Sequence, residues 1–142
     1  MKIAIGNDHD GYEMKIVVLR WLKEQGYKLK NFGANSPFVF NYPDYVQPVV
    51  NGVNIGEFDV GVIICGDGQK ISFAENEYRE INAALCWSKE ISQFSREHNN
   101  ANILCLPGKL LSDKAGIGIL KSFLETPIGG SRSNSLLEYE SV

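Results

Sequence analysis

Apolar residues along this chain follow two different spacings, and each spacing predicts one type of element. Short apolar runs that are typical of buried strands recur five times. Between them, apolar residues return every three or four positions, as in helices with one buried face. The alternation of strands with helical crossovers predicts a parallel sheet covered by helices. We therefore expect an α/β fold: a three-layer αβα sandwich with a five-stranded, Rossmann-like parallel sheet.

The expected strands cover residues 2–5, 27–32, 58–65, 82–86 and 102–106. The expected helices cover residues 10–25, a segment from Pro43, residues 71–77, 88–97, 112–124 and 134–140. Pro48 and Gly52 can shorten or kink the second helix. Ile91, Phe94 and Ser95 are expected to share one side of the fourth. Since no repeat or linker divides the chain, we expect one domain, 1–142, whose segment from about 127 packs on it or on a partner subunit.

The composition disfavours several classes of function. The chain has 142 residues, of which 44% are hydrophobic and 22% charged, as is ordinary for a soluble globular protein. No apolar run is long enough to span a bilayer, and the first six residues are too short for a signal peptide, so we expect a cytoplasmic protein. A net charge of −3 without a long basic run disfavours a nucleic-acid partner.

The three cysteines, Cys65, Cys86 and Cys105, lie in or at the ends of expected strands. Their odd number favours reduced thiols, and no C-x-x-C spacing indicates zinc. Cys65 differs from the other two because a glycine turn, 66–68, follows it at once. Ligands bind at the carboxyl ends of parallel strands, and glycine N–H groups can stabilise an anion there. The Cys65 thiol is therefore either directed at a ligand or an ordinary buried strand-end thiol.

Two other segments carry side chains suited to proton transfer. Asp8 and His9 follow the first expected strand, where a carboxylate beside an imidazole can bind sugar hydroxyls or move protons. The alternative is a polar turn in which Asp10 caps the next helix. His98 lies near the end of the fourth expected helix, just before the fifth strand. His98 is either a reactive group or a cation that complements the helix dipole. The adjacent Asn99 is either part of a site or an ordinary turn residue.

Five motifs occur in order between about Met1 and Gly130: Gly6-x-Asp8-His9-x-Gly11, Tyr42-Pro43-Asp44-Tyr45, Cys65-Gly66-x-Gly68, Ala83-Ala84-Leu85-Cys86 and Arg96-Glu97-His98-Asn99-x-Ala101-Asn102. Together they resemble the type B ribose-5-phosphate isomerases, a family that includes the galactose-6-phosphate isomerase subunits. The resemblance is specific for the superfamily and much less so for the substrate. It implies an aldose–ketose isomerase that uses no metal or other cofactor. It also implies a homodimer, which can pair further into a tetramer.

The resemblance further implies a role for each matching residue. Cys65 is the expected base that takes the proton next to the carbonyl, and the N–H groups of the loop 66–70 are expected to stabilise the enediolate oxygen. His98 is expected to open the sugar ring. Because the family's site lies between two subunits, His98 is expected to serve the partner subunit's Cys65. Asp8 is expected to contact the substrate's hydroxyls or ring oxygen. The other implied substrate contacts are His9 on the phosphate side, and Tyr42, Gly66, Asp67, Gly68 and Asn99.

The glycine loop departs from the family's pattern. Asp67 stands where the family has a threonine that assists the base. A carboxylate close to Cys65 would disfavour the thiolate by like-charge repulsion. Lys70 replaces a glycine of the family, and the following helix carries Glu75 and Glu77 where small and basic residues are usual. These changes concern the base and the anion-binding loop together.

The phosphate end also departs from the family's pattern. Ser131 and Ser135 replace two arginines that grip the phosphate, while Arg132 lies one place along. Lys109 replaces a further arginine, and a lysine does not reproduce a bidentate arginine–phosphate contact. One possibility is that Lys70, Lys109, Arg132 and loop N–H groups hold the phosphate of ribose 5-phosphate. The others are an isomerase for a four- or six-carbon sugar phosphate, and an impaired member that binds a sugar or a partner.

The joint presence of Asp8, His9, Cys65 and His98 favours an active isomerase, with ribose 5-phosphate and ribulose 5-phosphate as the expected pair. Two other folds share the strand–helix alternation. A flavodoxin would need a phosphate loop rich in Ser and Thr after the first strand, where this chain has carboxylates. A receiver domain would need an aspartate at the end of the third strand, where this chain has Cys65. Both alternatives are therefore disfavoured.

Overall fold

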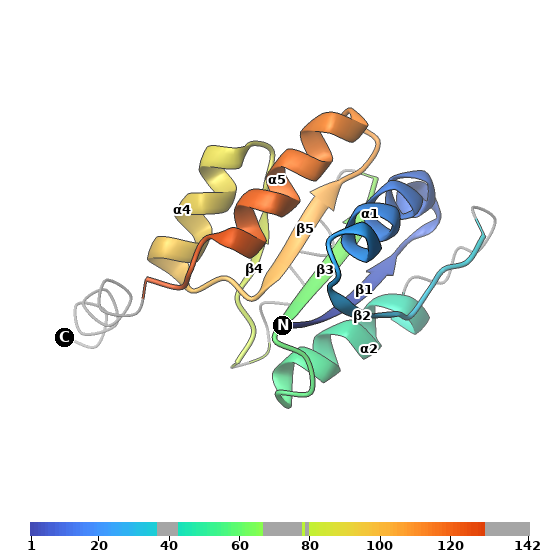
Figure 1. The fold of residues 1–142 in the computed structure, drawn as a ribbon. Helices are drawn as coiled ribbons and strands as arrows, with labels where there is room; N and C mark the ends of the chain where they lie inside the picture. Colours follow the sequence, from blue (N-terminus) through green and yellow to red (C-terminus); the bar gives the residue numbers. More distant parts are fainter. Residues whose placement is uncertain (37–42, 67–77, 79, 130–142) are drawn as a thin grey trace.

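The computed structural model shows one five-stranded sheet with helices on its two faces (Figure 1). It describes residues 1–36, 43–66, 78 and 80–129. The strands are β1 (Lys2–Asn7), β2 (Lys28–Asn31), β3 (Val60–Cys65), β4 (Ala83–Leu85) and β5 (Ile103–Pro107). Their order is β2-β1-β3-β5-β4, and every neighbouring pair is parallel. The predicted fold class and the five predicted strands are confirmed.

The helices are arranged in two layers around the sheet (Figure 1). One layer holds α1 (Tyr12–Glu24), α4 (Lys89–Asn99) and α5 (Asp113–Glu125), and α2 (Pro43–Asn54) covers the opposite face. A short 3₁₀ helix, η1 (His9–Gly11), precedes α1. None of the helices in the described ranges is long and apolar enough to cross a membrane. The helices predicted at 71–77 and 134–140, and most of the segment from 127, lie outside the described residues.

Strand β3 lies at the centre of the sheet and is buried on both sides. Val62 and Ile64 point into the core cluster beneath α1 and α5, whereas Ile63 and Cys65 point into the cluster beneath α2. Successive side chains of a strand point to opposite faces, which produces this alternation. A strand covered on both faces reads as a continuous apolar run, and this is the run that the sequence shows.

Serine side chains cap the two helices that were predicted at 88–97 and 112–124. The hydroxyl of Ser88 accepts the N–H of Ile91 at 3.2 Å at the start of α4. The hydroxyl of Ser112 accepts the N–H of Ala115 at 3.1 Å at the start of α5. Each bond satisfies one of the N–H groups that a helix start leaves without an intrahelical partner. A local sequence signal, a serine before an amphipathic segment, was therefore sufficient to predict where these two helices start.

Helix α2 is not shortened at Pro48 or Gly52. It continues to Asn54, although a proline removes one intrahelical hydrogen bond. The valines of α2 are buried in the core cluster beneath the sheet: Val46, Val49, Val50 and Val53. Their burial outweighs the lost hydrogen bond, because each buried valine contributes about 1.5 kcal/mol or more.

The predicted side of α4 was wrong in part. The buried residues of α4 are Ser92, Ser95 and Arg96, while Ile91 is 44% exposed and Phe94 is 55% exposed. The small Ser92 lets α4 approach α5 closely, and its hydroxyl donates to the carbonyl oxygen of Ile119 at 3.0 Å. Helix-to-helix contact through small polar residues leaves the apolar residues of α4 on the outer face.

Candidate functional site

The carboxyl edge of the sheet brings three strand ends together. The N–H of Asp8, after β1, donates to the carbonyl oxygen of Ile64 at 3.1 Å. The N–H of Gly108, after β5, donates to the carbonyl oxygen of Cys65 at 2.7 Å. The N–H of Lys109 donates to the carbonyl oxygen of Gly66 at 3.3 Å. The backbone that carries Asp8, Cys65 and Lys109 is therefore joined at the edge where ligands bind in open α/β sheets.

Gly11 makes this close approach possible. A Cβ atom at Gly11 would lie 2.1 Å from the carbonyl oxygen of Ile64 and 3.0 Å from the nitrogen of Cys65. Backbone atoms at these positions leave no space for any side chain. The glycine of the first motif therefore lets the turn after β1 lie directly on the end of β3.

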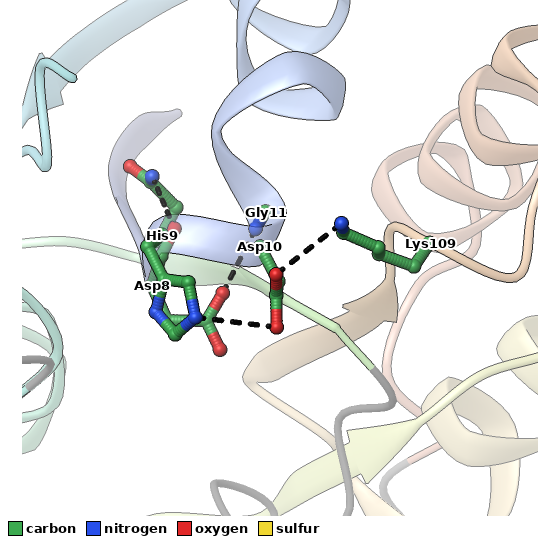
Figure 2. Close-up of polar contacts among 6 residues, drawn as sticks. Asp8, His9, Asp10, Gly11 and Lys109 are labelled. Carbon is green, nitrogen blue, oxygen red and sulfur yellow. Dashed lines mark hydrogen bonds and ion pairs between the residues drawn. The ribbon is translucent and has the colours of Figure 1, made fainter. Parts of the chain in front are cut away.

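Asp8 caps the turn that follows β1. Its Oδ1 atom accepts the N–H of Gly11 at 2.8 Å, so Asp8, and not Asp10, is the capping residue (Figure 2). Burial raises the pKa of the Asp8 carboxyl above its ordinary value of 3.8. The N–H groups of Gly11 and Gly66 oppose this shift, and the charge of Asp10 adds to it. A partly buried carboxyl with a raised pKa beside a strand-end thiol is suited to proton transfer or to hydrogen bonding with a hydroxyl.

The side chains of His9, Asp10 and Lys109 form a polar group at the same edge (Figure 2). The Oδ2 atom of Asp10 lies 3.4 Å from Nε2 of His9, and its Oδ1 atom lies 3.4 Å from Nζ of Lys109. The three side chains are 33%, 39% and 63% exposed, respectively. The predicted phosphate-side residues His9 and Lys109 therefore do lie near each other, with the carboxylate of Asp10 between them.

The sequence left two alternatives for the Cys65 thiol, a group directed at a ligand or an ordinary buried thiol, and the structure shows features of both. Cys65 ends β3 next to Asp8, yet only 3% of its surface is exposed and it belongs to the core cluster beneath α2. Cys86 and Cys105 are fully buried, and all three cysteines are reduced thiols outside any disulfide, as predicted. Burial raises the pKa of Cys86 to about 11, which keeps that thiol protonated. Of the three, Cys65 is the one at the carboxyl end of a central strand.

The structure does not bring His98 and Asn99 close to Cys65 in the same chain. Both end α4, which returns from β4 to the beginning of β5 (Figure 1). The first residue of β5, Ile103, pairs with Gly61, four residues before Cys65. The helix end and Cys65 are thus separated by about 13 Å or more along the strands. His98 stacks on the exposed Phe94, with 4.2 Å between ring centroids, and its Nε2 lies 4.0 Å from the Glu97 carboxylate.

Arg96 supports this helix end, a role that sequence reasoning missed. The guanidinium is buried, and it donates to the carbonyl oxygens of Ala101 at 2.6 Å and Thr126 at 3.0 Å. It also lies over the Phe123 ring, 4.9 Å from the centroid. Arg96 therefore joins the end of α4 to the end of α5. Its place in the fifth motif, two residues before His98, was the available signal.

Lys15 is the other residue that sequence reasoning missed. Its side chain is almost fully buried, and Nζ donates to the carbonyl oxygen of Ala34, with the side-chain oxygens of Asn31 and Asn35 at 3.4 and 3.5 Å. Burial lowers the pKa of Lys15 from 10.5 to about 8. Lys15 holds the loop after β2 against α1. A lysine three residues before Val18, on the apolar side of a predicted helix, was the signal for burial.

Several predicted site residues lie outside the described residues, so their positions stay predictions. They are Tyr42, Asp67, Gly68, Lys70 and Arg132. Gly66, at the start of the glycine turn, is described, and a Cβ atom there would lie 3.1 Å from Oδ2 of Asp10. The first residue of the predicted oxyanion loop is therefore in contact with the polar group at this edge.

Comparisons with known proteins agree with this arrangement. A family model described as Ribose/Galactose Isomerase matches residues 3–138. Ribose-5-phosphate isomerase B of Escherichia coli is 33% identical over 137 residues, which cover 96% of this chain and 92% of that protein. A crystal structure of a ribose 5-phosphate isomerase from Thermotoga maritima superposes with a TM-score of 0.92 at 39% identity, covering 97% of this chain and 95% of that one.

A second solved structure carries a ligand. Ribose-5-phosphate isomerase B of Mycoplasma genitalium, with bound ribulose-5-phosphate, superposes with a TM-score of 0.87 at 30% identity. The match covers 99% of this chain and 96% of that chain. The agreement therefore extends over nearly the full length of both proteins.

Proposed function

Because this chain belongs to the Ribose/Galactose Isomerase family of sugar-phosphate isomerases, we propose that it interconverts ribose 5-phosphate and ribulose 5-phosphate. The observation that carries the proposal is the junction of β1 and β3, where Asp8 follows the strand that pairs with the one ending in Cys65. A base and a hydrogen-bonding carboxyl meet at the edge where a ligand binds. The similar structure with bound ribulose-5-phosphate supports this choice of substrate.

The proposed chemistry is a proton transfer between two adjacent carbons. The Cys65 thiolate removes the proton from C2 of the open-chain aldose, and the electron pair forms the enediolate while the negative charge moves to the carbonyl oxygen. N–H groups of the turn that begins at Gly66 stabilise this oxygen. A proton then passes from the C2 hydroxyl oxygen to the C1 oxygen, and return of the first proton from the Cys65 thiol to C1 gives the ketose and restores the thiolate. Asp8 accepts or donates hydrogen bonds with the sugar's hydroxyls or ring oxygen during these steps.

A second subunit completes the proposed site. His98 opens the sugar ring in this mechanism, but within one chain it lies at the opposite edge of the sheet from Cys65. Ile91, Phe94 and His98 share the outer face of α4, because residues three and four positions apart are neighbours on a helix. This face carries two exposed apolar side chains and suits contact with another subunit. We therefore propose a homodimer in which each His98 serves the other subunit's thiol.

Turnover of ribose 5-phosphate by matched cysteine variants tests the proposal. Cys65→Ala is expected to lower kcat by about 10³-fold, since a positioned base contributes about 10²–10⁴-fold. Cys105→Ala removes a thiol from the same core cluster and is the control, with kcat close to that of the wild type. Wild-type kcat in a folded Cys65→Ala protein would overturn the assignment of the base. Turnover by the wild type of a four- or six-carbon sugar phosphate only would overturn the assignment of the substrate.

A further inference from the structure

We propose that Asp10 determines how strongly the site holds an anionic group, because its carboxylate competes with the substrate's phosphate for Lys109 and His9. This inference rests on the proposed function, since it concerns the phosphate side of the same site. Removal of the Asp10 charge is then expected to tighten phosphate binding. A purely structural role of Asp10 predicts the opposite sign.

The geometry places one carboxylate between an imidazole and an ammonium group. Each oxygen of Asp10 faces a different partner: Oδ2 faces Nε2 of His9 and Oδ1 faces Nζ of Lys109, both at 3.4 Å (Figure 2). A phosphate presents the same feature, several oxygens on one small anionic centre. Lys109 and His9, which the family resemblance assigns to the phosphate side, are thus already matched to an anion of this chain.

The two contacts are loose. A distance of 3.4 Å exceeds the approximately 2.7–2.9 Å of a short charge-assisted hydrogen bond. Both partners of the Lys109 pair are more than a third exposed, at 63% and 39%, so water screens the attraction. The pair therefore stabilises the fold little, and Lys109 can leave Asp10 for a stronger anion. The balance between carboxylate and phosphate decides the affinity for the ligand.

Asp10 is also held in place by its surroundings. A Cβ atom added at Gly66 would lie 3.1 Å from Oδ2 and 3.3 Å from Cβ of Asp10, so the side chain rests on the residue that follows Cys65. The charge of Asp10 contributes to the raised pKa of Asp8, which shows that two carboxyls act on the same small region. Two negative charges here oppose the entry of a dianion. Asp10→Asn removes the one of these two charges that contacts Lys109, with little change in side-chain shape.

The test is a double-mutant cycle on the binding of inorganic phosphate, measured by titration calorimetry without turnover. Asp10→Asn is expected to lower the Kd for phosphate by roughly tenfold, the size of one partly screened charge interaction. Lys109→Met is expected to raise Kd by less than about threefold in the wild type but by roughly tenfold in the Asp10→Asn protein. The difference arises because Lys109 is neutralised by Asp10 only when the carboxylate is present.

Glu13→Gln is the matched control. It removes one negative charge from an exposed position in the first turn of α1, whereas the ion pair of Lys109 is with Asp10. An equal effect of Glu13→Gln and Asp10→Asn would overturn the proposal in favour of a general charge effect. Weaker phosphate binding by Asp10→Asn, or equal effects of Lys109→Met in both backgrounds, would also overturn it.

The outcome is independent of the substrate assignment. If the wild type turns over ribose 5-phosphate, Asp10→Asn is expected to lower KM more than it changes kcat, as expected for uniform binding of an anionic group. A chain that couples Asp10 to Lys109 in phosphate binding but does not turn over ribose 5-phosphate keeps this inference and loses the proposed function. Normal turnover of ribose 5-phosphate without coupling between Asp10 and Lys109 keeps the proposed function and overturns this inference.

Discussion

Within one chain, Cys65 lies at the carboxyl ends of the parallel strands and His98 lies near their amino ends. Cys65 is the last residue of β3, while His98 lies in the last turn of α4, the helix that leads back to the beginning of β5. Register alone separates them, because the residue that opens β5 pairs four positions before Cys65. In the proposed mechanism, Cys65 and His98 can therefore act on one substrate only if they come from different subunits.

Complementation between two inactive variants tests this arrangement. Cys65→Ala and His98→Ala are each expected to be nearly inactive as homodimers. When co-expressed, half of the dimers are mixed, and one of the two sites in each mixed dimer has both native residues. The mixture is therefore expected to regain about a quarter of wild-type activity per chain. The measurement is the kcat per chain of the co-expressed mixture with ribose 5-phosphate.

The control for complementation is His98→Ala combined with the double variant Cys65→Ala, His98→Ala. No arrangement of these chains places a native Cys65 beside a native His98, so no recovery is expected. Absence of recovery in the first mixture, despite formation of mixed dimers, would show that both residues act within one chain or not at all.

Gly11→Ala is expected to be severely destabilising for a steric reason. The added Cβ atom would lie 2.1 Å from the carbonyl oxygen of Ile64, and backbone at the end of β3 cannot move away without disturbing Cys65. We expect a loss of about 3 kcal/mol or more in the free energy of unfolding, together with a lower kcat. Urea denaturation and turnover measure the two effects.

Gly26→Ala provides the comparison for Gly11→Ala. Gly26 has a φ of +80° and nothing within 4 Å of an added Cβ atom, so only backbone strain opposes the substitution. We expect a loss of about 1 kcal/mol and an unchanged kcat. Equal losses for the two variants would contradict the close approach of η1 to β3.

Two substitutions of Asp8 are expected to separate its capping role from its charge. Asp8→Ala removes the oxygen that accepts the N–H of Gly11 and is expected to cost about 1 kcal/mol. Asp8→Asn keeps an oxygen for this bond. Because burial raises the pKa of Asp8, the charged carboxyl is disfavoured in the fold at neutral pH, and the uncharged Asn does not carry this cost. We therefore expect Asp8→Asn to unfold at a higher temperature than Asp8→Ala, and thermal unfolding of both variants at neutral pH measures this difference.

The charge of Asp8 is also expected to shape the pH profile of turnover. If the ionised carboxyl takes part, kcat/KM of the wild type falls as the pH is lowered through the raised pKa, at a pH above 3.8. In Asp8→Asn this acid limb is expected to disappear along with most of the activity. An identical acid limb in both proteins would assign the titration to another group.

Lys15 is expected to make the stability of the fold depend on pH. Its pKa is lowered from 10.5 in an unfolded chain to about 8 in the fold. Between these values the unfolded chain holds a proton that the folded chain has released, so the free energy of unfolding rises with pH. Relative to Lys15→Met, we expect the wild type to gain about 1–3 kcal/mol between about pH 7.5 and pH 10.

Lys23→Met is the control for Lys15, because it makes the same change at an exposed position of the same helix. Denaturant unfolding at several pH values gives the free energies of the three proteins. The wild type and Lys23→Met are expected to respond to pH alike. Parallel curves for the wild type and Lys15→Met would contradict the burial of a titrating ammonium group.

The sequence by itself determined the strands of this fold, most of the described helices, and the strand ends that carry Asp8 and Cys65. Strand and helix spacings are local, so the five parallel strands and the helices expected at 88–97 and 112–124 were predicted correctly. The positions of Asp8 and Cys65 at strand ends followed from the same pattern, because parallel strands present their carboxyl ends at one edge. Motifs around these residues also identified the family, since they depend on residue type and order alone.

Only the tertiary structure decided which side chains meet. The contact of Asp10 with Lys109 joins residues from loops after β1 and β5, and the separation of His98 from Cys65 follows from strand register. The burial of Lys15 depends on a loop that begins after β2. These relationships involve residues distant along the chain, and their energies arise from strand order, register and burial, which no local pattern of residues encodes.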